Sequence, residues 1–300
     1  MAQFLILLAA FLIRISTAAF SGGFSSDTAC FAAWADRIYA LGPSGFYSPD
    51  VFTDYPPGYM YLLYPIGFLV SKTGIPYLGS LHLILLRLPS ILCDCITGQL
   101  LYKEAKKKFS SSHALFFSAL YLFNPAVILN SSLWGQVDSV FTLFLLCTCL
   151  LLIRDNLSAA YLTYAAALLI KPQALLFAPL MLFVFIKKIF LQDFSLKKLL
   201  LHLWQIFSAC LLLVLCSLPF GLKNVWQQYF STVDSYPYAS VNAYNFWALF
   251  GKNWVSQSEP FLGLPMRALS SIFILLICGF TAYLYFRPKK ERTNYPFLFA

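Results

Sequence analysis

The sequence predicts an all-α membrane protein, a polytopic bundle of transmembrane helices. Hydrophobic residues make up 60% of its 300 positions and charged residues only 11%. A soluble globule of this length needs more polar groups to cover its surface. Long apolar stretches recur along the chain and alternate with short charged segments. Roughly 20 apolar residues at helical rise suffice to cross the hydrocarbon core.

The basic balance of the chain does not predict a nucleic-acid partner. A formal net charge of +9 suggests nucleic acid in a soluble protein, but basic residues of a membrane protein mainly set its orientation. The sequence contains no RNA- or DNA-binding motif. All eight cysteines except Cys30 lie in apolar stretches, and the three histidines are far apart. We therefore expect neither a disulfide framework nor a histidine metal site.

We expect a single transmembrane domain over residues 1–300 with about eight crossings. The predicted crossings are residues 1–20, 78–102, 113–129, 137–153, 158–170, 174–186, 199–219 and 267–286. The first is interpreted as a retained helix rather than a signal peptide, because no Lys or Arg precedes Arg14. Residues 295–300 resemble the start of another crossing, so the C-terminal part of the fold is predicted to be incomplete.

A large external loop of the same domain is predicted over residues 21–77. Within it, residues 55–70 are apolar and rich in tyrosine but begin with paired prolines, which favours a helix lying along the membrane surface. If this stretch does not cross, the basic run at 103–108 is cytoplasmic, as are most of the 21 Lys and Arg. The arrangement then obeys the positive-inside rule.

The loop also holds four of the chain's 12 acidic residues, Asp27, Asp36, Asp50 and Asp54. Asp27 precedes an amphipathic helical pattern, where its carboxylate either caps the helix or acts chemically. Asp54 opens the motif D-Y-P-P-G, in which the prolines stiffen the chain; its role is turn formation or support of a site. Asp36 is interpreted as part of a solvated face and Asp50 as part of a turn.

Two charged residues lie inside the second predicted crossing. Arg87 and Asp94 are seven residues apart, hence two helical turns apart on one face. Charges at this depth are costly unless they are paired or line a wet cavity. They therefore mark either a functional or a structural site.

The motif W-G-Q-V-D, residues 134–138, lies at the predicted external end of a helix. The ring of Trp134 is suited to stack on a pyranose face, while Gln136 and Asp138 are suited to bind sugar hydroxyls. The alternative is an interfacial tryptophan with a helix cap.

Two further motifs lie at predicted external positions. In K-P-Q, Lys171 either pairs with a phosphate or extends to the interface, and Gln173 follows it. Asn245 lies in an aromatic, asparagine-rich segment, N-F-W.

Taken in this order, these motifs resemble the GT-C superfamily of polyprenyl-phosphate-sugar-dependent membrane glycosyltransferases. The resemblance is to bacterial relatives of the second mannosyltransferase of GPI-anchor assembly and to the glucosyltransferases of the N-glycan precursor. It spans residues 24–251 and rests on the ordered set rather than on any single motif. It implies a large first external loop with interfacial helices and an inverting transfer.

The resemblance also implies roles for individual residues. Asp27 matches the catalytic acid of the first loop and acts as general base on the acceptor, with Asp54 in support. Lys171 and Arg87 are candidates to hold the lipid phosphate. Family members often carry paired acids here, whereas Thr28 follows Asp27. No cofactor is assigned, and a divalent metal is left open.

The sequence therefore predicts a multi-pass cell-membrane enzyme whose active site lies on the external face. It would transfer a hexose, such as mannose, from a polyprenyl-phosphate sugar to a glycan, lipid or protein acceptor among membrane lipids. The alternatives are a multi-pass transporter or lipid flippase without transferase activity, and a polymerase or ligase that uses a lipid-diphosphate donor. A transporter usually shows internal repeats and ionisable groups near mid-membrane, whereas this chain shows no repeat.

Overall fold

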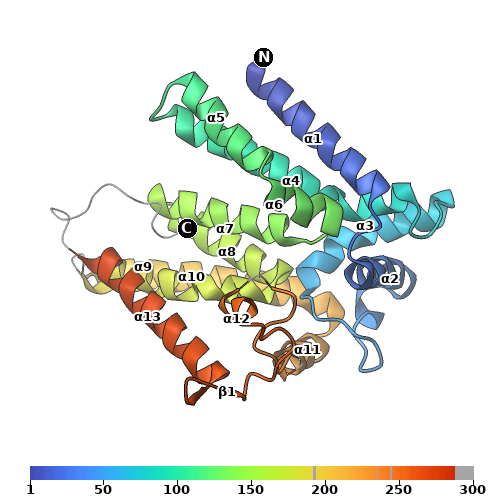
Figure 1. Cartoon of the computed structure of the whole chain (residues 1–300). Coiled ribbons are helices and arrows are strands. Elements are labelled where there is room, and N and C mark those ends of the chain that lie inside the picture. Colours follow the sequence, from blue (N-terminus) through green and yellow to red (C-terminus); the bar gives the residue numbers. More distant parts are fainter. Residues whose placement is uncertain (192–193, 235, 244, 288–300) are drawn as a thin grey trace. The chain divides into compact units, whose positions relative to one another are not determined.

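The computed structural model describes residues 1–191, 194–234, 236–243 and 245–287 and is almost entirely helical (Figure 1). The predicted all-α fold is confirmed. The chain forms two compact units. The first comprises Met1–Ala174 and Trp204–Val225, and the second comprises Leu175–Leu203 and Trp226–Ala300.

Long helices joined by short turns make up the first unit. They are α1 (Ala2–Phe20), α2 (Ser25–Leu41), α3 (Pro57–Thr73), α4 (Ser80–Lys106), α5 (Ser111–Leu122), α6 (Pro125–Ile128), the π-helical segment η2 (Leu129–Trp134), α7 (Asp138–Ile153) and α8 (Leu157–Ile170). Short 3₁₀ turns are η1 (Pro43–Gly45), η3 (Pro172–Phe177) and η4 (Leu218–Phe220). Helices α10 (Leu196–Ser217) and α11 (Leu222–Asp234) each have residues in both units.

Helix α4 is central to the first unit, since α1, α5 and α7 all pack against it (Figure 1). The buried residues of α1 are Ala10, Arg14 and Ala18, which recur every four residues and form one face. Helix α4 buries both of its charged mid-helix residues, Arg87 at 2% exposure and Asp94 at 0%. The core of this unit is therefore partly polar.

Helices α2 and α3 pack against each other through aromatic side chains. The ring of Phe31 lies 5.7 Å from that of Tyr55 and 5.2 Å from that of Tyr59, centroid to centroid. Helix α3 begins at Pro57, a residue suited to the first helical position. The aromatic contacts hold the start of α3 against α2.

By length and composition, five of the described helices can cross a membrane, or six if the bent pair Ser111–Leu122 and Pro125–Trp134 forms one span. Two shorter apolar helices, Asp138–Ile153 and Leu157–Ile170, cover two more of the predicted crossings. Every predicted crossing thus falls on an apolar helix or on the bent pair, although the number of crossings stays a prediction. The further span predicted from residue 295 lies outside the described residues.

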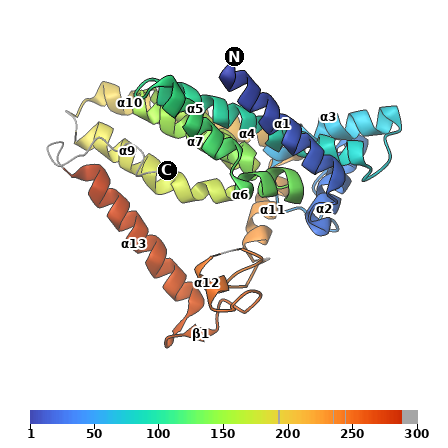
Figure 2. The same ribbon diagram turned by 45° about the horizontal axis from the view of Figure 1, so that its top comes forward.

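The second unit contains α9 (Ala178–Phe190), α12 (Phe246–Leu249), α13 (Met266–Phe286) and a hairpin of β1 (Pro260–Phe261) and β2 (Leu264–Pro265). The strands are antiparallel, with Pro260 opposite Pro265. Helix α13 follows the hairpin directly, and its far end packs against α9 (Figure 2). There Lys187 Nζ donates to the Tyr285 carbonyl at 3.1 Å.

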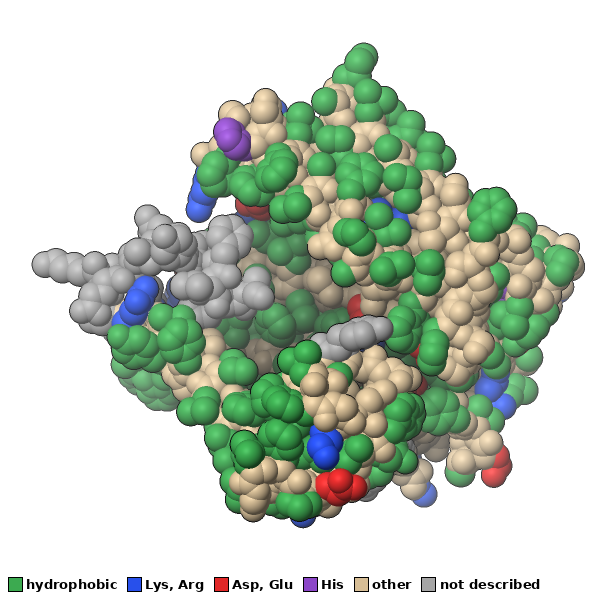
Figure 3. Space-filling model, in the orientation of Figure 1, with side chains coloured by type: hydrophobic (Ala, Val, Ile, Leu, Met, Phe, Trp, Pro, Cys, Tyr) green, Lys and Arg blue, Asp and Glu red, His purple; other side chains and the backbone are tan. Residues whose placement is uncertain are grey.

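Large apolar side chains remain exposed along several helices. On α1 they include Leu5, Leu8 and Leu12, away from the buried face of that helix. Figure 3 shows hydrophobic side chains gathered over the region of α1 and α5. A surface of this kind fits lipid rather than water.

Candidate active site

Asp27 lies in the first turn of α2, but it is not the cap of that helix. Phe24 occupies the N-cap position, and no side chain caps the helix there. The Oδ2 atom of Asp27 accepts a 2.8 Å hydrogen bond from Trp134 Nε1 and a second hydrogen bond from Gln136 Nε2. Among the described residues, no donor is found on Oδ1. Both hydrogen bonds are thus accepted by one carboxylate oxygen of a half-buried aspartate.

The two donors come from the end of the π-helical segment η2. Gly135 lies between them with a φ of 92°, a left-handed conformation that suits glycine. Backbone bonds join this segment to the start of α2, since Phe24 N–H donates to the Trp134 carbonyl at 3.2 Å. A side-chain bond adds to this contact, since Ser21 Oγ at the end of α1 donates to the Leu133 carbonyl at 3.0 Å. The end of η2 is therefore bonded to the joint between α1 and α2, residues 21–24, which brings Asp27 next to its two donors.

Tyr55 orients the amide of Gln136. Its hydroxyl donates to Gln136 Oε1 at 3.1 Å, so the amide nitrogen is turned toward Asp27. Burial raises the pKa of Tyr55 well above its ordinary value, and the neighbouring Tyr59 and the carboxylates of the site add to this effect. Tyr55 consequently stays protonated and remains a donor at physiological pH.

An ion pair lies on the other side of Tyr55. Lys171 Nζ pairs with Asp138 Oδ1, and Asn130 Nδ2 donates to Asp138 Oδ2 at 3.0 Å. The same lysine nitrogen lies 5.6 Å from the centroid of the Tyr55 ring, within cation–π range. The pair is partly exposed, with Lys171 at 13% and Asp138 at 36%. A cation thus lies beside the ring of Tyr55, whose hydroxyl bonds the Gln136 amide.

Arg87 lies under the joint of α1 and α2. Its Nη1 atom donates to the carbonyls of Ala18 at 2.6 Å and Ser21 at 2.9 Å, at the C-terminal end of α1, where a cation complements the helix dipole. Its Nη2 atom is buried without a hydrogen-bond partner among the described residues. A Cβ on Gly23 would lie 2.3 Å from Nη2. Only glycine leaves room for the guanidinium there.

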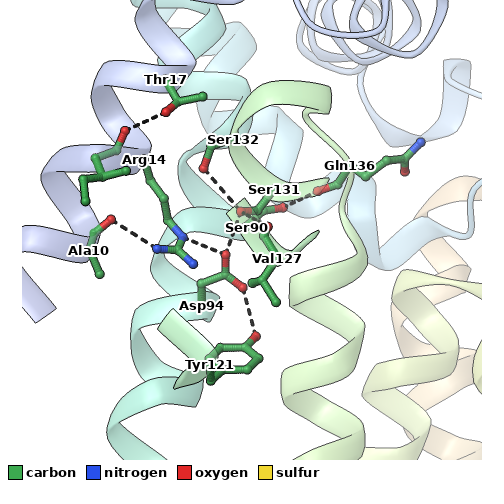
Figure 4. Close-up of polar contacts among 11 residues, drawn as sticks. Ala10, Arg14, Thr17, Ser90, Asp94, Tyr121, Val127, Ser131, Ser132 and Gln136 are labelled. Atoms are coloured by element: carbon green, nitrogen blue, oxygen red, sulfur yellow. Dashed lines mark hydrogen bonds and ion pairs between the residues drawn. The ribbon is translucent and has the colours of Figure 1, made fainter. Parts of the chain in front are cut away.

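Asp94 does not share its partners with Arg87. It pairs with Arg14, whose Nε lies 2.9 Å from Asp94 Oδ2, and both side chains are fully buried. Tyr121 donates to Oδ1 at 3.0 Å and Ser131 to Oδ2 at 2.6 Å. Figure 4 shows the cluster between α1, α4 and η2. Sequence analysis did not select Arg14 because its partner lies on another helix.

Comparison with known families identifies the chain. Residues 60–220 match the family model described as dolichyl-phosphate-mannose-protein mannosyltransferase, which is more than half of the 300 residues. The chain belongs to this family. It is a membrane glycosyltransferase of the GT-C type, which confirms the resemblance noted from its motifs. A comparison with curated proteins gives no match.

The matched range contains six of the candidate residues, Arg87, Trp134, Gln136, Asp138, Lys171 and Gln173. Asp27, Asp54 and Asn245 lie outside it. The family match therefore covers Trp134 and Gln136, the two donors to Asp27, together with the cations Arg87 and Lys171. It does not cover Asp27 itself.

The remaining candidates are less closely tied to Asp27. Asp54 is half-buried, and burial together with the negative charges of Asp54 and Asp27 raises the pKa of Cys30. Gln173 is exposed in the turn η3. Asn245 belongs to the second unit, where its side chain caps α12 by accepting from Ala248 N–H at 3.1 Å.

A metal site is not evident in the described part of the chain, where no group of three His, Cys, Asp or Glu side chains is close enough to hold an ion. Asp27 and Asp138 each accept hydrogen bonds from protein donors instead. Tyr55 is the residue of this site that sequence analysis did not select. Tyr55 is part of the motif D-Y-P-P, and this motif was the sequence feature that could have selected it.

Proposed function

We propose that the protein transfers a hexose, with mannose as the first candidate, from a polyprenyl-phosphate donor to an acceptor hydroxyl at the external face of the membrane. The acceptor is a glycan, a lipid or a protein. The family match supports glycosyl transfer. The observation that carries the proposal is the Asp27 carboxylate, which is held through Oδ2 by Trp134 and Gln136. We propose that Oδ1, which has no donor among the described residues, receives the proton of the acceptor.

In the proposed reaction, Asp27 is the general base. The acceptor oxygen attacks the anomeric carbon as its proton passes to Oδ1 of Asp27. The bond between that carbon and the phosphate oxygen breaks, and the phosphate leaves with the electron pair. Because attack and departure occur on opposite faces of the sugar, the configuration inverts. Trp134 and Gln136 keep the carboxylate in place during the step.

Charge that develops on the leaving phosphate requires nearby cations. Lys171 is the proposed direct contact, since it is partly exposed and held by Asp138. Arg87 is only 2% exposed, so we do not propose a direct contact with the phosphate. Its positive charge would instead raise the electrostatic potential near the first turn of α2. The proposed phosphate therefore contacts Lys171, and Arg87 acts on it only through its charge.

The sugar is proposed to lie against Trp134. Phe24 packs against that ring with a centroid distance of 4.9 Å. Trp134 is half-buried, and the proposal assigns the rest of its ring to a pyranose. Gln136 and Asp138 supply hydroxyl contacts, and Asp54 supports the loop. The proposed contributions of Gln173 and Asn245 rest on the K-P-Q and N-F-W motifs.

The proposal is tested by transfer of labelled sugar from a polyprenyl monophosphate in membranes that contain Asp27→Asn. We expect the rate to fall about a hundredfold to ten-thousandfold. Asp36→Asn, on the same helix, is the matched control and should retain the wild-type rate. Asp27→Asn activity near wild type at equal expression would sink the assignment of the base. Donor use of a polyprenyl diphosphate instead would indicate the polymerase or ligase alternative.

A further inference from the structure

The π-helical segment η2 and the turn that follows it are held to α4 at two points. Ser90 Oγ donates to the Gln136 carbonyl at 2.8 Å, and Ser131 Oγ lies 2.6 Å from Asp94 Oδ2. Ser90 and Asp94 are four residues apart and therefore lie on one face of α4 (Figure 4). The short stretch that carries Trp134 and Gln136 is thus fixed against a single helix.

Three oxygens lie within hydrogen-bond reach of Ser131 Oγ, namely Asp94 Oδ2, the Val127 carbonyl at 3.0 Å and Ser132 Oγ at 3.3 Å. A hydroxyl has one proton, and a carboxylate is the stronger acceptor. The bond to Asp94 therefore ties a segment with a π-helical backbone to α4. Such segments are uncommon and often accompany functional sites.

Arg14 sets the position of Asp94 in turn. Its Nε donates to Asp94 at 2.9 Å, and its Nη1 donates to the Ala10 carbonyl of its own helix at 3.2 Å. Tyr121 of α5 donates to the other carboxylate oxygen. The carboxylate is therefore held by α1 and α5 and presents Oδ2 to Ser131.

We infer that Arg14, Asp94 and Ser131 are positioning residues, which hold η2 so that Trp134 and Gln136 meet Asp27. The inference rests on the proposed role of Asp27. It deepens that role by assigning a function to a buried ion pair outside the substrate site. A misplacement of about 1 Å at a catalytic group is enough to cost about a hundredfold in rate.

Ser131→Ala is the variant to make. Substituting Arg14 or Asp94 leaves the other charge buried without its partner, which threatens folding itself. Removing the Ser131 hydroxyl leaves the ion pair and the Tyr121 bond in place. The matched control is Ser118→Ala, another fully buried serine, whose hydroxyl joins α5 to the Gly98 carbonyl of α4 at 2.8 Å and does not touch η2.

We expect Ser131→Ala to lower kcat about tenfold to hundredfold with KM unchanged, while Ser118→Ala retains the wild-type kcat. In a Trp134→Phe/Gln136→Met background the further loss should shrink to within about twofold, because the contacts through which Ser131 acts are already gone. An undiminished loss in that background overturns the inference. It would show that Ser131 acts on the fold in general.

Hydrogen exchange of purified protein gives a readout that does not need transferase activity. Amides of residues 129–137 should exchange faster in Ser131→Ala than in wild type or Ser118→Ala, and equal exchange overturns the inference. If wild-type membranes transfer no sugar, the proposed function fails and exchange alone decides the positioning role. If Asp27→Asn is fully active, the base assignment fails, while the coupling of Ser131 to Trp134 and Gln136 is still measured.

Discussion

At the scale of residues, Tyr55 connects the two polar groups of the site. Its hydroxyl holds the Gln136 amide, and its ring lies beside the Lys171–Asp138 pair. Without the hydroxyl, the amide is free to turn its oxygen toward Asp27, where two acceptors would face each other. The tyrosine therefore decides whether Gln136 donates to the Asp27 carboxylate or turns an acceptor toward it.

Tyr55→Phe tests this directly. We expect kcat to fall about tenfold, which corresponds to one hydrogen bond of roughly 1.4 kcal/mol, with stability little changed because the ring remains. Tyr39→Phe, also between α2 and α3, is the control. A Tyr55→Phe enzyme with wild-type kcat would contradict the orienting role.

Tyr55 also makes the stability of the protein depend on alkaline pH. Its pKa is raised in the folded chain, so above about pH 10 the unfolded chain releases a proton that the folded chain retains. The stabilising contribution is fully present below about pH 10 and is lost as the pH rises toward the folded-state value. Thermal unfolding of purified protein should show this loss, with a smaller fall in Tyr55→Phe. Identical pH profiles for the two proteins would contradict the prediction.

At the scale of elements, the joint between α1 and α2 decides where Asp27 lies. Gly23 has a φ of 75°, and its hydrogen faces the buried Arg87 guanidinium. Any side chain here needs a strained backbone and displaces Arg87 from the carbonyls that end α1. The start of α2 would then shift, and Asp27 with it.

Gly23→Ala should therefore destabilise the protein by about 1–3 kcal/mol or more and reduce transfer activity. Gly22→Ala is a close control, because a Cβ there meets nothing within 4 Å and the backbone has no positive φ. Thermal unfolding and the transfer assay compare the two. Equal behaviour of both variants would show that the joint tolerates a side chain.

Sequence analysis predicted the helices well, because apolar length and periodicity are local properties of the chain. It also selected Asp27, Trp134 and Gln136, which the structure brings together. It did not pair Arg14 with Asp94, since the pairing depends on how α1 packs on α4. The bond from Ser131 to Asp94 was equally hidden, because it is a tertiary contact between η2 and α4 rather than a result of local propensity.

At the scale of the whole molecule, the orientation in the membrane decides which substrates reach Asp27. The basic residues 103–108 end α4 and the tyrosine-rich helix α3 precedes it. If α3 crossed the bilayer, the Asp27 loop and the basic run would lie on the same side of the membrane, and the positive-inside rule would place both in the cytoplasm. The predicted external position of the site therefore depends on α3 lying along the membrane surface, so one experiment tests both.

Reporter fusions on either side of α3 separate the two arrangements. Alkaline phosphatase joined after Asp50 or after Pro76 should be active in both cases, because both points are expected to be external, and inactive after Lys107. Green fluorescent protein at the same points should give the reverse pattern, since it fluoresces in the cytoplasm. Opposite signals at Asp50 and Pro76 would mean that α3 crosses the membrane. The loop that carries Asp27 and the basic run would then lie on the same side, and the positive-inside rule would place both in the cytoplasm, out of reach of an external acceptor.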